Sequence, residues 1–124
     1  MTRIYLSGPM TGYPDFNKAA FADAAFQLRE LGFDVVNPHQ LPEPVLLPGD
    51  EEYNWRQYMA RDAERIISDT SIEGVVVLPG WEKSRGSTLE CRIAQSLGLN
   101  VYKLETVLKA ANDIKAGENK NERN

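Results

Sequence analysis

Short apolar runs alternate along this chain with longer amphipathic segments, and this alternation limits the possible folds more than any other feature of the sequence. The apolar runs lie at residues 4–7, 33–37, 74–78 and 100–104. Each has the length of a strand, and the third is apolar at successive positions, as is typical of a parallel strand buried on both faces. We therefore expect four strands separated by helices.

The segments between these runs carry apolar residues at helical spacing. In the first of them one stripe is formed by Phe21, Ala24, Ala25, Leu28 and Leu31. The expected helices cover residues 17–31, 53–68, 87–97 and 107–114. Residues 39–51 are rich in proline and without period, which predicts a long binding loop. Residues 117–124 predict a polar, disordered tail behind a single domain over residues 1–116.

Strands that alternate with helices at this spacing predict an α/β domain with a short parallel sheet and helices on both faces. Right-handed crossovers favour a flavodoxin-like or Rossmann-like sheet with the strand order 2-1-3-4. Ligands bind such sheets beyond the carboxyl ends of the strands, where the order reverses. The Gly- and Pro-rich turns at 8–12, 37–38 and 79–81 are therefore expected to surround one crevice.

The bulk composition excludes several classes of protein. A chain of 124 residues with 42% hydrophobic and 26% charged residues is typical of one soluble globular domain. Its net charge of −4 and scattered basic residues argue against binding to a nucleic-acid polymer. The single Cys allows no internal disulfide. One Cys and one His are too few for a zinc site built from His and Cys ligands. No secretory leader or membrane span is expected, which favours a cytoplasmic protein.

Asp62 is a carboxylate in an unexpected place. It falls within the apolar stripe of the second expected helix, between Trp55 and Ile66. A carboxylate on a stripe that faces the core must be paired, neutralised or exposed to a cavity. The pattern leaves two interpretations open: an ion pair with Arg65 one turn away, or a site in the crevice.

Glu90 is the second such carboxylate. It begins an inward-facing row with Ile93 and Ala94 and is expected in the first turn of its helix, where the macrodipole would keep it ionised. The segment from Ser87 to Glu90 also fits a capping box, in which Glu90 would only bond back to the backbone. Considered together, an ionised Glu90 and a partly buried, more easily protonated Asp62 form the kind of pair that cleaves glycosidic bonds.

The ordered set of motifs resembles the nucleoside 2-deoxyribosyltransferase superfamily and, within it, a small, often phage-borne branch of the DUF4406 type. The resemblance rests on residues 4–12 (IYLSGPMTG), Asp62, residues 78–81 (LPGW) and residues 84–90 (SRGSTLE), and it covers the chain from Arg3 to about Leu104. It implies that Glu90 is the nucleophile toward the anomeric carbon, that Asp62 is the second catalytic acid and that Tyr5 orients Glu90. It also implies a homodimer or larger oligomer.

The substrate residues implied by the resemblance lie in the strand-end loops. The stretch from Ser84 to Glu90 is similar to the deoxynucleoside 5′-monophosphate hydrolases of that superfamily, and Ser84, Arg85, Gly86 and Ser87 would form a phosphate cradle at a helix N-terminus. Gly8, Pro9, Met10 and Thr11 would line the same site. Those hydrolases tend to carry Ser and Arg where this chain has Pro9 and Thr11, so the substrate stays open.

Three other residues have two interpretations each. Trp81 can stack on a base or cover the end of the third strand. His39 can act as a base or be a bystander in the loop. Cys91 is most simply a small core residue.

Three functions follow as hypotheses. The first is cleavage of the N-glycosidic bond of a nucleoside or (deoxy)nucleoside 5′-monophosphate, by hydrolysis or base transfer, with no metal or redox cofactor. The alternatives are a non-catalytic nucleotide-binding or sensor module and an NAD-type glycohydrolase. Each takes a small nucleoside or nucleotide as its partner, and none involves a membrane.

Overall fold

The computed structural model describes residues 2–46, 48–50 and 54–122 of the chain, the backbone alone after Gly117. It contains a four-stranded, all-parallel sheet in the order β2-β1-β3-β4, which confirms the predicted fold class. The strands are β1 (Arg3–Ser7), β2 (Asp34–Val36), β3 (Ile72–Val77) and β4 (Asn100–Lys103). Strands β2 and β4 lie inside the predicted runs, whereas β1 and β3 begin one and two residues before them.

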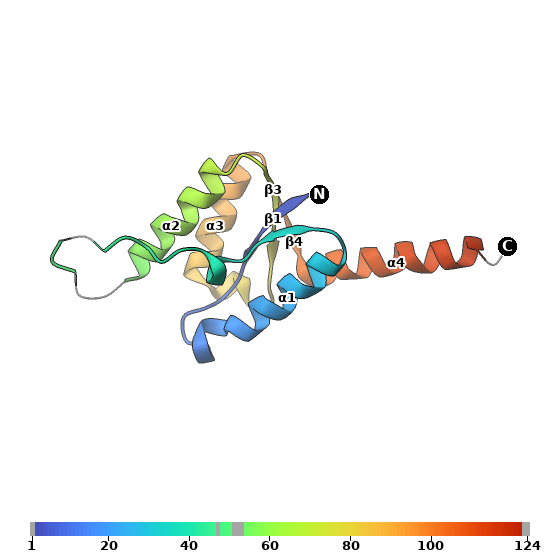
Figure 1. Ribbon diagram of the computed structural model, residues 1–124, viewed down its shortest axis with the longest axis horizontal. Coiled ribbons are helices and arrows are strands. Elements are labelled where there is room, and N and C mark those ends of the chain that lie inside the picture. Colours follow the sequence, from blue (N-terminus) through green and yellow to red (C-terminus); the bar gives the residue numbers. More distant parts are fainter. Residues whose placement is uncertain (1, 47, 51–53, 123–124) are drawn as a thin grey trace.

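Four α-helices connect and follow the strands: α1 (Lys18–Glu30), α2 (Trp55–Ser68), α3 (Arg85–Ser96) and α4 (Leu104–Glu122). Short 3-10 turns occur at Pro14–Asn17, Pro38–Gln40 and Trp81–Lys83. The predicted first residue of the second helix, Tyr53, lies outside the described residues. Figure 1 shows α2 and α3 side by side, α1 across the sheet, and α4 running away from the other elements.

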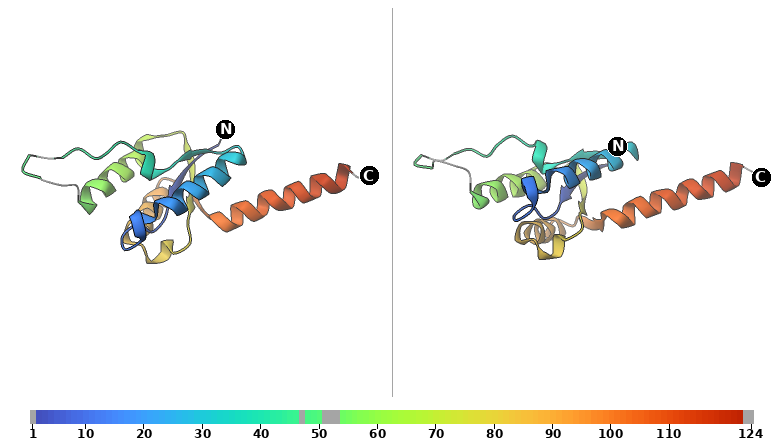
Figure 2. Two further views of the ribbon diagram at one scale, coloured as in Figure 1. Left: turned by 60° about the horizontal axis from the view of Figure 1, so that its bottom comes forward. Right: turned by 90° about the horizontal axis from the view of Figure 1, so that it is seen from below.

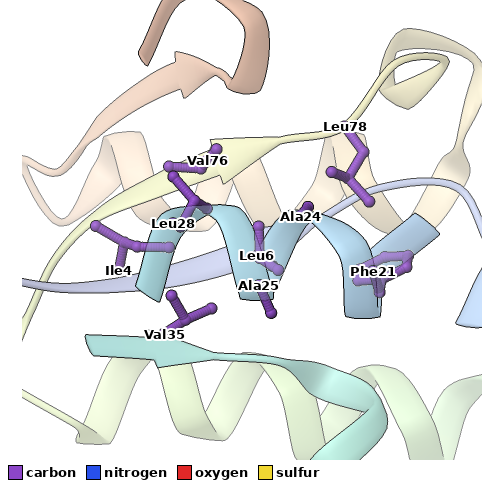
Figure 3. Packing of buried hydrophobic residues seen from close by; sticks show 9 residues of the cluster. All are labelled: Ile4, Leu6, Phe21, Ala24, Ala25, Leu28, Val35, Val76 and Leu78. Atoms are coloured by element: carbon purple, nitrogen blue, oxygen red, sulfur yellow. The ribbon is translucent and has the colours of Figure 1, made fainter. Parts of the chain in front are cut away.

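The two faces of the sheet have separate cores. On the α1 side, Ile4, Leu6, Val35, Val76 and Leu78 pack against the predicted stripe of α1, of which Phe21, Ala24, Ala25 and Leu28 are buried (Figure 3). The stripe repeats at helical spacing, so burying it removes one apolar face of α1 from water. The last predicted member, Leu31, follows the helix and is 38% exposed.

The second core lies under α2 and α3, and it includes Tyr5, Ile66, Val75 and Cys91. Because side chains alternate along a strand, Tyr5 points to this face while Ile4 and Leu6 point to the other. The alternation therefore aims one face of β1 at α3, and this placement builds the site described below.

Helix α4 is longer than predicted at both ends. It begins directly after β4, and Leu104 and Val107 pack against the core on the α1 side. It continues to Glu122, through most of the segment expected to be a disordered tail. The segment contains no proline, and the helix that tertiary contacts have started continues through Gly117 and Asn119 although both residue types have low helix propensity. In both views of Figure 2 this helix projects away from the sheet.

Candidate active site

A cleft of about 770 Å³ opens at the carboxyl ends of β1, β2 and β3, where the strand order predicted it. Its walls come from the loop after β1, the turn after β2 and the N-terminal parts of α2 and α3. The ends of β1 and β3 lie very close to each other here. A Cβ added to Gly8 would come within 2.9 Å of the Cβ of Leu78. Only glycine fits at this position without moving the strands apart.

Glu90 lies in the floor of the cleft and is 5% exposed. Its two carboxyl oxygens accept hydrogen bonds from different hydroxyls of β1. The phenol of Tyr5 donates to Oε2 at 2.6 Å, and the hydroxyl of Ser7 donates to Oε1 at 2.8 Å. The predicted contact between Tyr5 and Glu90 is therefore present. Ser7 was missed, although its spacing from Tyr5 puts both residues on the same face of the strand.

The capping-box interpretation of Ser87 and Glu90 is wrong. Helix α3 begins at Arg85, and its N-cap is Ser84, whose hydroxyl accepts a hydrogen bond from the backbone N–H of Ser87 at 3.1 Å. Glu90 therefore lies beyond the first turn, with its side chain directed to β1. The true capping box is at the start of α2, between Asn54 and Gln57.

The expectation that the helix start keeps Glu90 ionised is wrong for the same reason. Burial is the main cause that raises the pKa of Glu90, to about 8, and the negative charge of Asp62 raises it further. The hydrogen bonds from Tyr5 and Ser7 act in the opposite direction. The buried phenol of Tyr5 has a pKa raised well above 10.0, so it remains a donor. The surroundings of Glu90 therefore favour its protonated form.

Asp62 is also buried, at 6% exposure, and it interacts electrostatically with Glu90. Its ion-pair partner is Arg61, at 2.9 Å, so the interpretation that paired it with Arg65 is wrong. Arg65 instead pairs with Asp69, whose carboxylate also binds Arg3. Burial raises the pKa of Asp62, while the charge of Arg61 lowers it. The two carboxyl groups thus lie in different environments, as expected. The carboxyl group with an ion-pair partner is that of Asp62.

Arg61 is a second residue that was missed. Besides Asp62, its guanidinium binds the carbonyl oxygens of Pro38 at 3.1 Å and Pro42 at 3.3 Å. It also lies over the ring of Tyr58, 5.2 Å from the centroid. Arg61 therefore connects α2 with the segment after β2. The sequence does not reveal this role, because it depends on the three-dimensional path of that segment.

The residues predicted to form a phosphate cradle lie in the wall of the cleft. Ser84, Arg85, Gly86 and Ser87 all line it. A Cβ on Gly86 would lie 3.4 Å from the sulfur of Met59, an ordinary van der Waals contact, so α3 passes close to α2 here. The guanidinium of Arg85 lies 3.8 Å above the ring of Trp55, which fixes its position at the cleft.

The loop after β1 forms the opposite wall, with Gly8, Pro9, Met10 and Thr11. Beyond it, three consecutive residues, Asp15 to Asn17, have left-handed backbone angles, with φ of 49, 51 and 64°. The amide of Asn17 donates to the carbonyl of Pro9 at 3.0 Å and stabilises this turn. Left-handed geometry is costly for residues other than glycine, and it concentrates here at the mouth of the cleft.

Three single residues are placed as follows. Trp81 lies outside the cleft and packs against the core under α2 and α3; among the described side chains its buried indole N–H has no hydrogen-bond partner. Cys91 is buried in the same core. His39 lines the cleft, with Nε2 3.0 Å from the carbonyl oxygen of Phe16. Partial burial lowers the pKa of His39.

Fold and cleft together define an α/β protein that places a pair of buried carboxyl groups at the carboxyl edge of a parallel sheet. Over residues 2–103 the chain matches the family described as "Domain of unknown function (DUF4406)", and it belongs to this family. No curated protein and no solved structure matches the chain.

Two structural findings bear on other kinds of site. Within residues 2–46, 48–50 and 54–122, no helix is long and apolar enough to cross a membrane. The same part of the chain has no group of three or more His, Cys, Asp or Glu side chains arranged to hold a metal ion.

Proposed function

We propose that this protein cleaves the N-glycosidic bond of a nucleoside or a nucleoside 5′-monophosphate. The observation that carries the proposal is the pair at the cleft floor: Glu90, held at both oxygens by Tyr5 and Ser7, beside Asp62, held by Arg61. Two carboxyl groups with different environments can divide the roles of nucleophile and acid. The resemblance to the nucleoside deoxyribosyltransferases assigns these roles to the same residues.

In the proposed reaction an ionised Glu90 forms a bond to the anomeric carbon while the bond from that carbon to the base nitrogen breaks. Asp62 gives its proton to the leaving base. Water, or a second base in a transferase, then attacks the anomeric carbon, gives its proton to the Asp62 carboxylate and releases Glu90 as a carboxylate. The reactive form has one proton on the pair, located on Asp62, so a bound substrate must favour this arrangement over the proton on Glu90.

The N-terminus of α3 supports a 5′-monophosphate as the substrate group. The backbone of Arg85 and Gly86 begins the helix, where N–H groups are unpaired and the dipole favours an anion. Lys18 and Lys83 also line the cleft. Pro9 and Thr11, which depart from the pattern of the hydrolases, leave a nucleoside without phosphate open as the substrate.

Three further properties belong to the same proposal. The protein works without a metal or redox cofactor, it is cytoplasmic, and it forms a homodimer or larger oligomer. The last of these follows from the resemblance alone.

The test is chromatography of a mixture of deoxynucleosides, deoxynucleoside and ribonucleoside monophosphates and NAD after incubation with the protein. We expect free base from the wild-type protein and none from Glu90→Gln, a loss on the order of 10⁴-fold or more, which is the scale seen when a nucleophile is removed. Glu64→Gln is the matched control, because Glu64 is exposed on α2 and outside the cleft. The consumed compound would identify the substrate, including NAD.

Two outcomes would contradict the proposal. Full activity in Glu90→Gln would remove Glu90 from the reaction. No free base from the wild-type protein, together with a higher melting temperature in the presence of one nucleotide, would favour a binding or sensor module instead.

A further inference from the structure

The hydroxyl of Ser7 has a second partner besides Glu90. Its Oγ lies 2.6 Å from the Oγ of Ser87, and either atom can be the donor. Both serines are buried, Ser7 at 0% and Ser87 at 1% exposure, and Ser87 is also one of the residues that line the cleft. The two hydroxyls thus form a continuous path from Oε1 of Glu90 to the cleft.

We propose that Ser7 and Ser87 are positioning residues for Glu90: their hydroxyls form a chain of hydrogen bonds from Oε1 to the cleft, and this chain reverses its direction when the carboxyl group gains or loses a proton. A hydroxyl has one proton and two lone pairs, so each serine can donate to one neighbour and accept from the other. The inference rests on the proposed function for the role of Glu90 as nucleophile.

The two directions follow from the protonation of Glu90. When Glu90 is ionised, Ser87 donates to Ser7 and Ser7 donates to Oε1. When Oε1 carries a proton, Glu90 donates to Ser7, Ser7 donates to Ser87, and the hydroxyl proton of Ser87 can be directed to the sulfur of Cys91 or to a group in the cleft. No hydrogen bond in the chain is lost in either state, which matters because an unpaired polar group is costly when buried.

Other groups that carry or can gain a charge surround Glu90 from each packed element. They are Tyr5 on β1, Asp62 on α2 with its partner Arg61, and Cys91 on α3. Burial raises the pKa of the Cys91 thiol to about 11, and that of Tyr5 is higher than its usual value, so neither ionises near neutral pH. The test therefore changes the serines and leaves all four residues in place.

The experiment is an infrared titration of the carboxyl groups in protein labelled with ¹³C-glutamate, in which Glu90→Gln identifies the signal of Glu90. We expect Ser7→Ala to move the titration midpoint of Glu90 upward by about one pH unit, because a hydroxyl that donates to a carboxylate favours its ionised form. Ser87→Ala keeps the bond from Ser7 to Oε1 and should move the midpoint by less than half as much. Ser96→Ala, an exposed serine on α3, should leave it unchanged.

An unchanged midpoint in Ser7→Ala would overturn the inference, as would a shift in Ser87→Ala as large as that in Ser7→Ala. Should Ser7→Ala not fold, Ser7→Cys, which keeps a side chain of similar shape but a weak donor, must show an upward shift, and its absence has the same meaning. The titration needs no substrate. If the protein cleaves no glycosidic bond, the proposed function is refuted. The infrared titration still decides whether the two serines position Glu90.

Discussion

The five residues of β1 form two faces, and the two faces have different roles. Toward α1, Ile4 and Leu6 pack only against apolar side chains (Figure 3). Toward α3, Tyr5 and Ser7 direct hydroxyls at Glu90. The comparison shows how a small domain separates stability from chemistry: the buried core on the α1 side is made of apolar residues, while the other face buries carboxyl groups that cost stability.

The largest effect on stability is expected on the apolar face. Leu28 is fully buried in the α1 core, and Leu28→Ala should lower the free energy of unfolding by about 3–4 kcal/mol, through lost burial and the cavity left behind. Urea denaturation measures this change. The Glu90 titration of the folded variant should stay as in the wild type, since the sheet separates Leu28 from the cleft. A shifted titration would show that the two faces are coupled.

Arg61 provides an intermediate effect on the other face. Arg61→Met leaves the buried Asp62 without its cation and should cost about 2 kcal/mol of stability, below the range for fully buried pairs because 16% of the Arg61 side chain is exposed. Arg65→Met is the matched control on the same helix, and its pair with Asp69 is more exposed, so its cost should stay below about 1 kcal/mol. Equal costs in urea denaturation would mean that the pair in the cleft is no more than a surface ion pair.

The last effect is a slope of stability against pH, whose size per pH unit is smaller than the two changes above. In the folded protein the pKa of Glu90 is raised to about 8, from the ordinary value of 4.5. Between pH 4.5 and 8 the folded protein therefore keeps a proton on Glu90 that the unfolded chain has released. This stability is complete below the unfolded pKa and is lost as the pH rises through the folded one. We expect the free energy of unfolding to fall over this window by at most about 1.4 kcal/mol per pH unit.

The control for the slope is Glu90→Gln, which has no titrating group at this position. Urea denaturation of both proteins across the window should give curves that converge at low pH and separate as the pH rises. Parallel curves would show that Glu90 titrates at an ordinary pKa in spite of its burial.

The fold was predictable because its signals are local. Alternating runs predict strands and helices, and the right-handed crossover rule leaves few strand orders, of which 2-1-3-4 is the one present. Asp62 was recognised because a carboxylate within an apolar stripe conflicts with its surroundings. Such conflicts can be found in a sequence without knowing the partner.

The partners themselves were not predictable, because they depend on packing. Arg61 and Arg65 are both close to Asp62 in the sequence, and only the path of the segment at Pro38 and Pro42 selects Arg61. The capping-box pattern at Ser87 was misleading because the N-cap is another serine three residues earlier, Ser84, and the helix begins at Arg85. Trp81 follows a strand end, but the side to which its ring turns is decided by the core beneath α2 and α3.

Helix α4 has a practical consequence for handling the protein. Its 19 residues would extend about 28 Å at 1.5 Å per residue, and it runs away from the side of the domain where α2 lies (Figure 1). An affinity tag, a fluorophore or a surface attachment joined behind this helix would be held at a distance from the cleft mouth. Immobilised protein should thus stay open to small molecules.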